Sequence, residues 1–205
     1  MKKIFITFTL LTTLIIGYYV WFVHFNYRMV TISPNKVYKS GLIEPSKLEG
    51  FLLDKNIKTV INLLIPTVQD ELNPADQSHI DAEQNAIHAI NKKHNTNIAH
   101  INIASNQVPT KTTLTQFFKV LDNPKNYPVL IHCYHGTGRA QIYSALYRIE
   151  YEKWKNQDAR AKTRLILQAF NYKSSFADGK PKGDFLMKYR PRSEGNLSTM
   201  ATLKK

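Results

Sequence analysis

The sequence contains a single cysteine, Cys133, among its 205 residues. One cysteine can form neither an intramolecular disulfide nor a cysteine-based metal cage, which excludes disulfide-stapled folds and zinc fingers. A lone thiol also has no second thiol in the chain to trap it, so the cysteine count is compatible with an extracytoplasmic location. Four histidines lack a metal-site spacing with neighbouring carboxylates, and we expect no bound metal at His79, His88, His94 and His100.

Acidic residues are scarce, because 15 Asp and Glu oppose 28 Lys and Arg and leave a formal net charge of +13. The basic residues are spread along the chain, which favours anionic partners such as phosphorylated substrates or acidic lipid head groups. The chain has no zinc-finger spacing and no aromatic RNA-binding signature. We therefore expect no nucleic-acid partner.

Only one long stretch of the chain is apolar, and it runs from Ile4 to Phe25. About 20 apolar residues suffice to cross a bilayer as a helix, and aromatic residues near the far end, such as Trp21, suit a membrane interface. A cleaved signal peptide is the alternative, since Lys2 and Lys3 resemble its charged start. We favour a retained single-pass anchor, because the stretch offers no small-x-small cleavage site and exceeds a typical signal-peptide core.

The charges that flank the apolar stretch indicate on which side of the membrane the following domain lies. Lys2 and Lys3 hold the N-terminus towards the cytoplasm, while Arg28, Lys36 and Lys39 act in the opposite sense. An anchor with a very short basic N-terminus usually leaves the following domain outside, so the balance favours an extracytoplasmic domain.

The chain is long enough for one domain with a sizeable core. We predict an anchor or signal peptide over 1–28, a linker over 29–36, a catalytic domain over 37–188 and a flexible basic tail over 189–205.

Within this domain, apolar strands alternate with amphipathic helices. The patterns predict strands at 36–42, 57–64, 97–103 and 129–131, and helices at 45–55, 77–94, 112–121, 139–154 and 158–170. This alternation predicts an α/β fold with a central, mainly parallel sheet flanked by helices. Active-site loops in such folds lie at the carboxyl ends of the strands.

The stretch from Pro128 to Ala140 carries the strongest chemical signal. Val129 to Ile131 is typical of a short buried strand, and a glycine-bearing loop leads from it into a helical stretch that begins at Arg139. A strand, a tight loop and a helix N-terminus together form an anion cradle from backbone N–H groups and the helix dipole. The only cysteine opens this loop, so we predict a thiol that faces a phosphate-sized site.

The pattern His132-Cys133-x5-Arg139, with Gly136 at the third loop position, resembles the signature of the protein tyrosine phosphatase superfamily. Further segments are similar to its dual-specificity-like branch, namely 37–41, 57–63 and 121–133. The resemblance covers roughly Val37 to Trp154 and implies a cysteine phosphatase that uses no cofactor and no metal. It also implies that the imidazole of His132 fixes the loop and tunes the thiol.

The chemistry of such a site follows from its residue types. A cysteine among N–H donors at a helix N-terminus and near Arg139 is expected to have its thiol pKa lowered into the range of about 3.5 to 7.5. Cys133 would attack phosphorus in line and form a cysteinyl-phosphate intermediate. Arg139 would hold two phosphate oxygens in a fork. The expected phosphate-binding amides are those of Tyr134, His135, Gly136, Thr137, Gly138 and Arg139.

Two positions depart from the family pattern. The family usually has a Ser or Thr after the arginine, to help the thiolate leave, where this chain has Ala140; Thr137 is an alternative hydroxyl. The family's general acid normally lies some tens of residues before the cysteine, on the loop after the preceding strand, and here that loop, 104–111, contains no carboxylate. Loss of a general acid typically costs about 10²–10⁴-fold, which favours aryl phosphates with good leaving groups.

The general acid is therefore unassigned. Asp70, Glu71 or Asp76 on the long loop 65–76 could reach the site instead, whereas Asp122 is expected to cap a helix end.

These observations predict a membrane-anchored cysteine phosphatase that acts on phosphotyrosine, in proteins, or on related small phosphomonoesters. The first alternative is a catalytically weak or dead pseudophosphatase that binds a phosphorylated partner, which Ala140 and the missing acid favour. The second is a sulfurtransferase or an arsenate reductase, although arsenate reduction commonly needs resolving thiols that this chain lacks.

Overall fold

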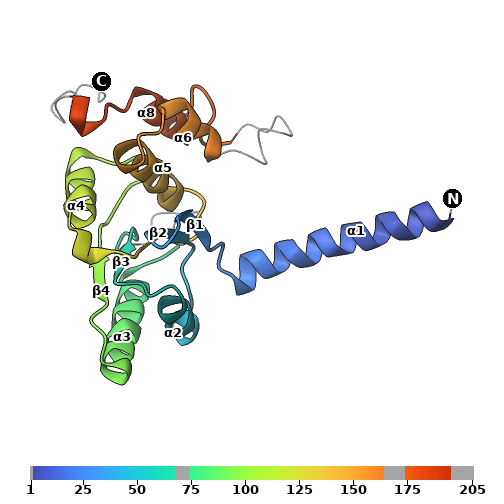
Figure 1. Cartoon of the computed structure of the whole chain (residues 1–205), viewed down its shortest axis with the longest axis horizontal. Coiled ribbons are helices and arrows are strands. Elements are labelled where there is room, and N and C mark those ends of the chain that lie inside the picture. Colours follow the sequence, from blue (N-terminus) through green and yellow to red (C-terminus); the bar gives the residue numbers. More distant parts are fainter. Residues whose placement is uncertain (1, 68–73, 164–173, 195–205) are drawn as a thin grey trace.

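A computed structural model describes residues 2–67, 74–163 and 174–194 of the chain. Its helices and strands follow in the order α1 (Lys2–Val20), η1 (Trp21–Phe25), β1 (Val30–Ser33), β2 (Val37–Ser40), α2 (Pro45–Asp54), β3 (Thr59–Asn62), α3 (Gln77–His94), β4 (Ala99–Asn102), α4 (Lys111–Leu121), η2 (Pro124–Asn126), β5 (Val129–His132), α5 (Arg139–Tyr151), α6 (Asn156–Lys162), α8 (Pro181–Lys188) and η3 (Arg192–Glu194). The predicted α/β class is confirmed, with helices on both faces of one sheet (Figure 1).

The sheet has five strands in the order β1-β2-β5-β3-β4. Strand β1 pairs antiparallel with β2, and all other pairs are parallel. In the register of the parallel strands, His132 of β5 lies opposite Ser40 of β2 and Asn62 of β3. The loops that follow these three strands therefore leave the sheet at one common edge, where the loop after β5 carries Cys133.

Strand β5 lies in the middle of the sheet and is buried at all four positions. Its side chains alternate between the faces, as a strand requires. Leu130 belongs to the apolar cluster under α2 and α3, whereas Val129 and Ile131 belong to the larger cluster under α4, α5 and α8. The loop after β5 thus starts from a fully buried strand at the centre of the sheet.

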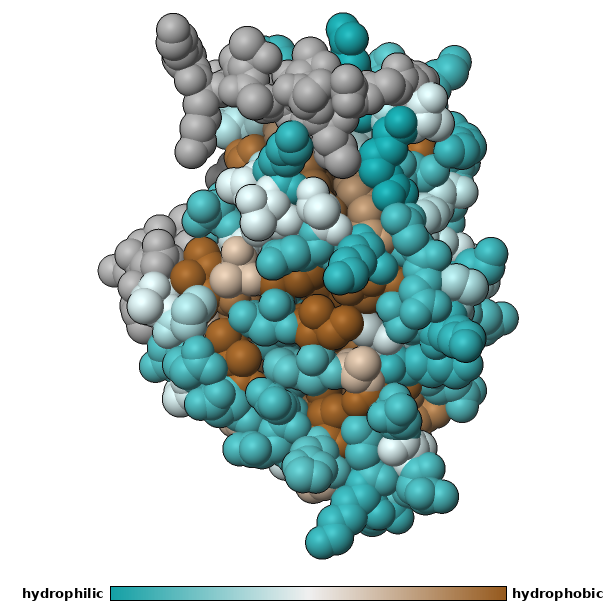
Figure 2. Space-filling model, turned by 90° about the vertical axis from the view of Figure 1, so that its left-hand side faces the viewer, coloured by the Kyte–Doolittle hydropathy of each residue, from teal (hydrophilic) through white to brown (hydrophobic). Residues whose placement is uncertain are grey.

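Helix α1 extends away from the rest of the molecule (Figure 1). Together with η1 it forms a 22-residue apolar span, Ile4–Phe25, whose length and composition would allow it to cross a membrane. Its large apolar side chains are exposed, for example Phe5 at 72% and Leu14 at 70%. The face of the domain turned away from α1 differs, because hydrophilic residues surround its smaller hydrophobic areas (Figure 2).

Several expected boundaries need correction. The range 29–36 is not a linker, because β1 lies within it and pairs with β2 as an edge strand. The tail does not begin at 189: Tyr189 is buried, its hydroxyl donates to Glu150, and η3 follows it. The helix expected at 158–170 is seen as α6, and its second half lies outside the described residues. The sequence patterns did not predict α8 at all.

Candidate active site

The loop 133–138 connects β5 to α5 and encloses the sulfur of Cys133. This side chain is only 3% exposed, and its Sγ accepts hydrogen bonds from the backbone N–H groups of Gly136 (3.3 Å) and Ala140 (3.5 Å). Ala140 lies in the first turn of α5, so the thiol sits at a helix N-terminus among inward-pointing amides. The predicted strand, loop and helix are confirmed, and we call this loop with its inward-pointing N–H groups the cradle.

Gly136 is required by the shape of this loop. Its φ is +71°, which L-residues rarely adopt, and a Cβ there would lie 2.5 Å from the backbone nitrogen of Gly41. Gly41 itself packs against the backbone of Tyr134 and His135, and the N–H of Leu42 donates to the carbonyl of Tyr134 (2.9 Å). The segment after β2 therefore packs against the backbone of the loop and supports its conformation.

Arg139 is buried and crosses the carboxyl edge of the sheet. Its Nη1 donates to the carbonyl of Leu63 (2.8 Å), with a longer contact to the carbonyl of Ser105 (3.4 Å). These carbonyls follow β3 and β4, so two further loops fix the plane of the guanidinium. A guanidinium held in this way at the edge of the loop is suited to bind an oxyanion in the cradle.

A second cation lies beneath the loop. Lys39 of β2 is only 5% exposed, and its Nζ donates to the carbonyl of Gly136 (2.9 Å). Burial lowers the pKa of Lys39 to about 8, although the nearby Cys133 opposes this shift. The sequence analysis assigns Lys39 to a predicted strand and to the family-like segment 37–41 but gives it no role in the site, because the burial of every residue of β2 is evident only from the structure.

His132 belongs to a buried polar cluster with Glu83 of α3 and His100 of β4. The Oε2 atom of Glu83 lies 2.9 Å from Nε2 of His132 and 2.8 Å from Nε2 of His100, and it accepts from Nδ2 of Asn62 at 2.7 Å. Burial would raise the pKa of the Glu83 carboxyl, but the two histidines outweigh burial and hold it at about 2. A buried anion thus fixes the imidazole directly before Cys133.

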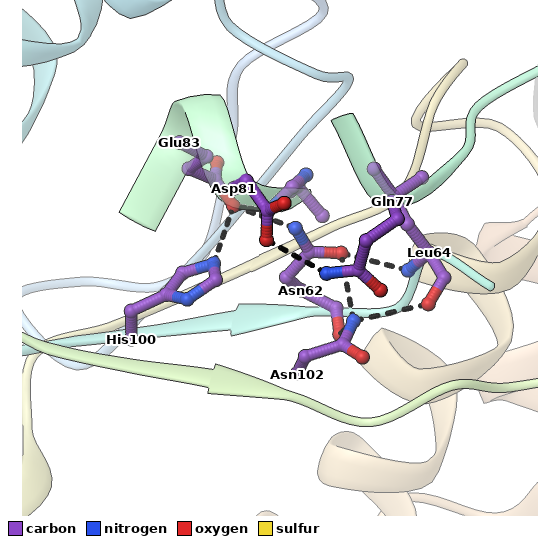
Figure 3. Close-up of polar contacts among 8 residues, drawn as sticks. Asn62, Leu64, Gln77, Asp81, Glu83, His100 and Asn102 are labelled. Atoms are coloured by element: carbon purple, nitrogen blue, oxygen red, sulfur yellow. Dashed lines mark hydrogen bonds and ion pairs between the residues drawn. The ribbon is translucent and has the colours of Figure 1, made fainter. Parts of the chain in front are cut away.

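Further hydrogen bonds extend this cluster along the strand ends (Figure 3). The Oδ1 atom of Asn62 accepts from the N–H of Leu64 (2.7 Å), and Nδ2 of Asn102 donates to the carbonyl of Leu64 (3.0 Å). Glu83 was not predicted from the sequence. It occupies the apolar face of α3 beside Ile80 and Ile87, and a carboxylate at such a position was the signal that could have identified it.

The outer rim of the loop, which we define as Thr137, Gly138, Gln107 and Lys182, is built differently. Thr137 is exposed, and a Cβ on Gly138 would lie 3.1 Å from both Oε1 of Gln107 and Nζ of Lys182. Burial lowers the pKa of Lys182, which the nearby Cys133 partly counteracts. Lys182 comes from α8 and was therefore missed by the sequence patterns.

Of the three expected general acids, Asp76 lies within the described residues, and its hydrogen-bond partner His79 has its ring centroid 6.0 Å from that of Tyr134 in the catalytic loop. Asp76 caps α3, where hydrogen bonds from Ser78 and His79 lower the pKa of its carboxyl to about 2. Asp122 caps α4 and pairs with Arg192 (2.7 Å), which confirms its expected place at a helix end. Asp70 and Glu71 lie outside the described residues.

No metal site emerges among the described residues, which contain no group of three or more His, Cys, Asp and Glu side chains able to hold an ion. The Glu83 cluster has a single carboxylate, and its oxygen is already committed to the two imidazoles and to Asn62.

Comparison with known proteins places this site in context. Residues 35–178 match the family described as "DSP-PTPase phosphatase fused to NAD+ Kinase". Among solved structures, the chain is similar to the catalytic core of the PP-IP phosphatase SIW14 from S. cerevisiae, with 18% identity, a TM-score of 0.54, and coverage of 79% of this chain and 85% of that one. It is also similar to TpbA from P. aeruginosa, with 17% identity, a TM-score of 0.55, and coverage of 80% and 86%.

A third similar structure is PTPMT1, crystallised in complex with PI(5)P, with 16% identity, a TM-score of 0.50, and coverage of 78% of this chain and 92% of that one. At these identities the three structures share the fold with this chain. No curated protein sequence matches it.

Proposed function

Because the chain belongs to the DSP-PTPase phosphatases of the cysteine-based protein tyrosine phosphatase superfamily, we propose that it is a membrane-anchored phosphatase acting on phosphotyrosine or related phosphomonoesters. The observation that carries the proposal is the environment of Cys133. Two backbone N–H groups donate to its sulfur at the N-terminus of α5, and the side chains of Arg139 and Lys39 are buried beside the same loop.

In this proposal Cys133 acts as the nucleophile. Its thiolate attacks phosphorus, the bond to the leaving-group oxygen breaks, and a cysteinyl phosphate forms. The amides of residues 134–139 and the guanidinium of Arg139 stabilise the charge on the equatorial oxygens in the transition state. Water then attacks the same phosphorus, which releases inorganic phosphate and restores the thiolate. His132 acts indirectly, by fixing the start of the loop from its contact with Glu83 (2.9 Å).

Aryl phosphates fit this site better than alkyl phosphates do. The loop 104–110 contains no carboxylate, and its Ser105 hydroxyl bonds instead to the hydroxyl of Tyr143 (2.8 Å). Phenolate leaves with little protonation, whereas an alkoxide depends on a general acid worth about 10²–10⁴-fold. Phosphotyrosine, in a protein or a small molecule, is therefore the preferred substrate class.

The exposed apolar helix supports a single-pass membrane anchor. With the short basic start of the chain, it favours a catalytic domain on the extracytoplasmic side.

The test uses the full chain purified in detergent micelles, with p-nitrophenyl phosphate as substrate between pH 5 and 8. We expect vanadate-sensitive turnover that is lost in Cys133→Ser, a variant that keeps the size of the side chain and removes the only thiol. Absence of turnover in the wild-type chain would refute the enzymatic proposal. Tight phosphopeptide binding by calorimetry in that case would identify a pseudophosphatase module instead.

A further inference from the structure

The turn that follows the apolar helix, Asn26 to Met29, touches the catalytic loop directly. Nη1 of Arg28 donates to the carbonyl of His135 at 3.0 Å, and the carbonyl of Tyr27 accepts from the N–H of Gly41 at 2.7 Å. Arg28 and His135 lie 107 positions apart in the sequence. The end of the anchor helix is thus in contact with the cradle that holds Cys133.

The carbonyl that Arg28 contacts belongs to the same peptide unit that donates to the sulfur. In a trans peptide the C=O of one residue and the N–H of the next point in opposite directions. When Arg28 holds the carbonyl of His135 outward, the N–H of Gly136 points inward, where it donates to Sγ of Cys133 at 3.3 Å. A charged donor on the oxygen also polarises the unit and strengthens the hydrogen bond on its other side.

Lys39 does the same for the next peptide unit. Its Nζ donates to the carbonyl of Gly136 at 2.9 Å, which turns the N–H of Thr137 towards the cradle. Because β1 and β2 are antiparallel and Val30 lies opposite Lys39, Arg28 and Lys39 support two successive peptide units of the loop from the same end of this strand pair. Lys182, on the rim, interacts electrostatically with Cys133 from the other side of the loop.

The turn is also tied to the helix that precedes it. The N–H of Arg28 donates to the carbonyl of Phe22 at 2.8 Å, and the N–H of Asn26 donates to that of Trp21 at 2.9 Å. Tyr27 and Arg28 both adopt left-handed backbone conformations, with φ of 50° and 53°. Such conformations in non-glycine residues persist only where surrounding contacts enforce them, and here the helix and the cradle supply those contacts.

We propose that Arg28 is a positioning residue for catalysis, which acts on Cys133 through the peptide unit between His135 and Gly136 and thereby couples the anchor helix to the active-site loop. The proposal rests on the proposed function, in which Cys133 must be a thiolate. It gives the residues at the membrane boundary a role in the reaction in addition to attachment.

The experiment measures the reactivity of Cys133, the only thiol in the chain, in the full-length protein in detergent micelles. Alkylation by iodoacetamide is followed by mass spectrometry from pH 4 to 9, for the wild type and for Arg28→Gln. Loss of a charged hydrogen bond behind the loop should shift the midpoint of the profile by about one pH unit upward, and slow alkylation about tenfold on the acidic limb. Protection by inorganic phosphate should weaken in parallel.

Lys36→Gln is the matched control, because it removes the same charge from an exposed position in the turn between β1 and β2. Its profile should stay within about twofold of the wild type, since exposed charges act weakly through solvent. If the profiles of Arg28→Gln and Lys36→Gln superimpose, the proposal is wrong. If Arg28→Gln does not fold, Arg28→Met decides instead, because methionine keeps much of the aliphatic side chain and removes the charged donor: an upward shift supports the proposal and an unchanged profile overturns it.

Two glycines inserted between Phe25 and Asn26 test the coupling to the helix. They leave Arg28 in the chain but release the turn from the helix, and we expect a shift in the same direction as Arg28→Gln and smaller than it. An unchanged profile would refute the coupling. Alkylation and phosphate protection require no turnover, so an inactive wild-type chain would refute the proposed function while leaving this test valid.

Discussion

Beneath the Cys133 loop, Lys39, Glu83 and His132 are buried and hold their positions through hydrogen bonds of 2.7 to 2.9 Å. At the outer rim, by contrast, Thr137 is exposed, and Lys182 reaches Gly138 from a helix far along the chain. The residues beneath the loop, which we call the underside, therefore fix the backbone amides and the sulfur. Hydrolysis of any phosphate ester at this site would depend on both. We expect the rim to contact the group to which the phosphate is attached. Substitutions below the loop should affect all substrates alike, and substitutions at the rim should discriminate between them.

Lys39→Met should have the largest effect. It leaves the buried carbonyl of Gly136 without its 2.9 Å donor and frees the peptide unit that presents the N–H of Thr137. Loss of one preorganised donor typically lowers kcat by about 10²–10³-fold, and we expect a loss of about that size for aryl and alkyl phosphates alike. Steady-state kinetics with p-nitrophenyl and alkyl phosphates would check it, and a loss confined to one substrate would contradict the division between underside and rim.

The lowered pKa of Lys39 predicts opposite pH dependences for activity and for stability. Its pKa is lowered from 10.5 to about 8, so activity that needs the ammonium should fall as pH rises through about 8. Between these two values the unfolded chain binds more protons than the folded chain, so this group makes stability rise with pH over the same window. Lys39→Arg keeps its charge and should remove the alkaline limb, and a limb unchanged in this variant would assign it to another group.

Glu83→Gln should have the next largest effect, on stability. Its carboxyl pKa is lowered from 4.5 to about 2, so its contribution to the free energy of unfolding is complete above pH 4.5 and is lost as pH falls towards 2. A shift of this size corresponds to about 3 kcal/mol at neutral pH. Urea unfolding at pH 7 and pH 3 should show a difference between variant and wild type that shrinks in acid. Glu49→Gln, which weakens surface contacts with Lys93 and His94, should change stability little.

Lys182→Met tests the rim. The ammonium lies beside Gly138, where it can contact the anionic substrate, so we expect KM to rise about tenfold with a smaller change in kcat. Lys180→Met is the matched control, because Lys180 is exposed at the start of the same helix. Equal effects in the two variants would show that general surface charge, and not the position of Lys182, governs substrate binding.

Ala140→Ser should have the smallest effect. Ala140 is buried, and its N–H already donates to Sγ at 3.5 Å, so a serine hydroxyl there would lie close to the sulfur. We expect the hydroxyl to stabilise the departing thiolate and to raise turnover several-fold. Rapid-mixing kinetics should then show a smaller burst and a faster steady state. A slower steady state would show that the packed first turn of α5 does not tolerate the added oxygen.

The active-site loop was predictable because it is local. Val129 to His132 pair within the sheet, and Gly136 permits a turn that a Cβ would block, so strand, loop and helix follow from one continuous stretch. The bounds of α3 also match the prediction, because the Asp76 cap and the apolar spacing of Ile80, Ile87 and Ile90 specify them. For this loop and for α3, the pattern of neighbouring residues was sufficient, whereas β1 and α8 lacked a recognisable pattern.

The supports of the loop were not predictable in this way, because they come from distant parts of the chain. Arg28 and Lys39 lie about a hundred positions before the carbonyls they contact, and Lys182 lies in α8, which has no strong sequence pattern. Arg192 was assigned to a flexible tail, yet it binds both Asp122 and Glu150. Only the tertiary fold brings these charges together. A charged residue on an otherwise apolar helix face, such as Glu83, is the one sequence feature that indicates a buried polar contact.

The single, buried thiol has a consequence for oxidative damage. A peroxide that reaches the Cys133 thiolate would convert it to a sulfenic acid, which other proteins commonly protect by forming a disulfide with a neighbouring thiol. This chain offers no second cysteine for that reaction. Recovery must therefore come from a small thiol that enters the cradle, or from condensation with a backbone nitrogen such as that of Gly136, which already lies 3.3 Å from the sulfur. Without either, further oxidation would inactivate the protein permanently.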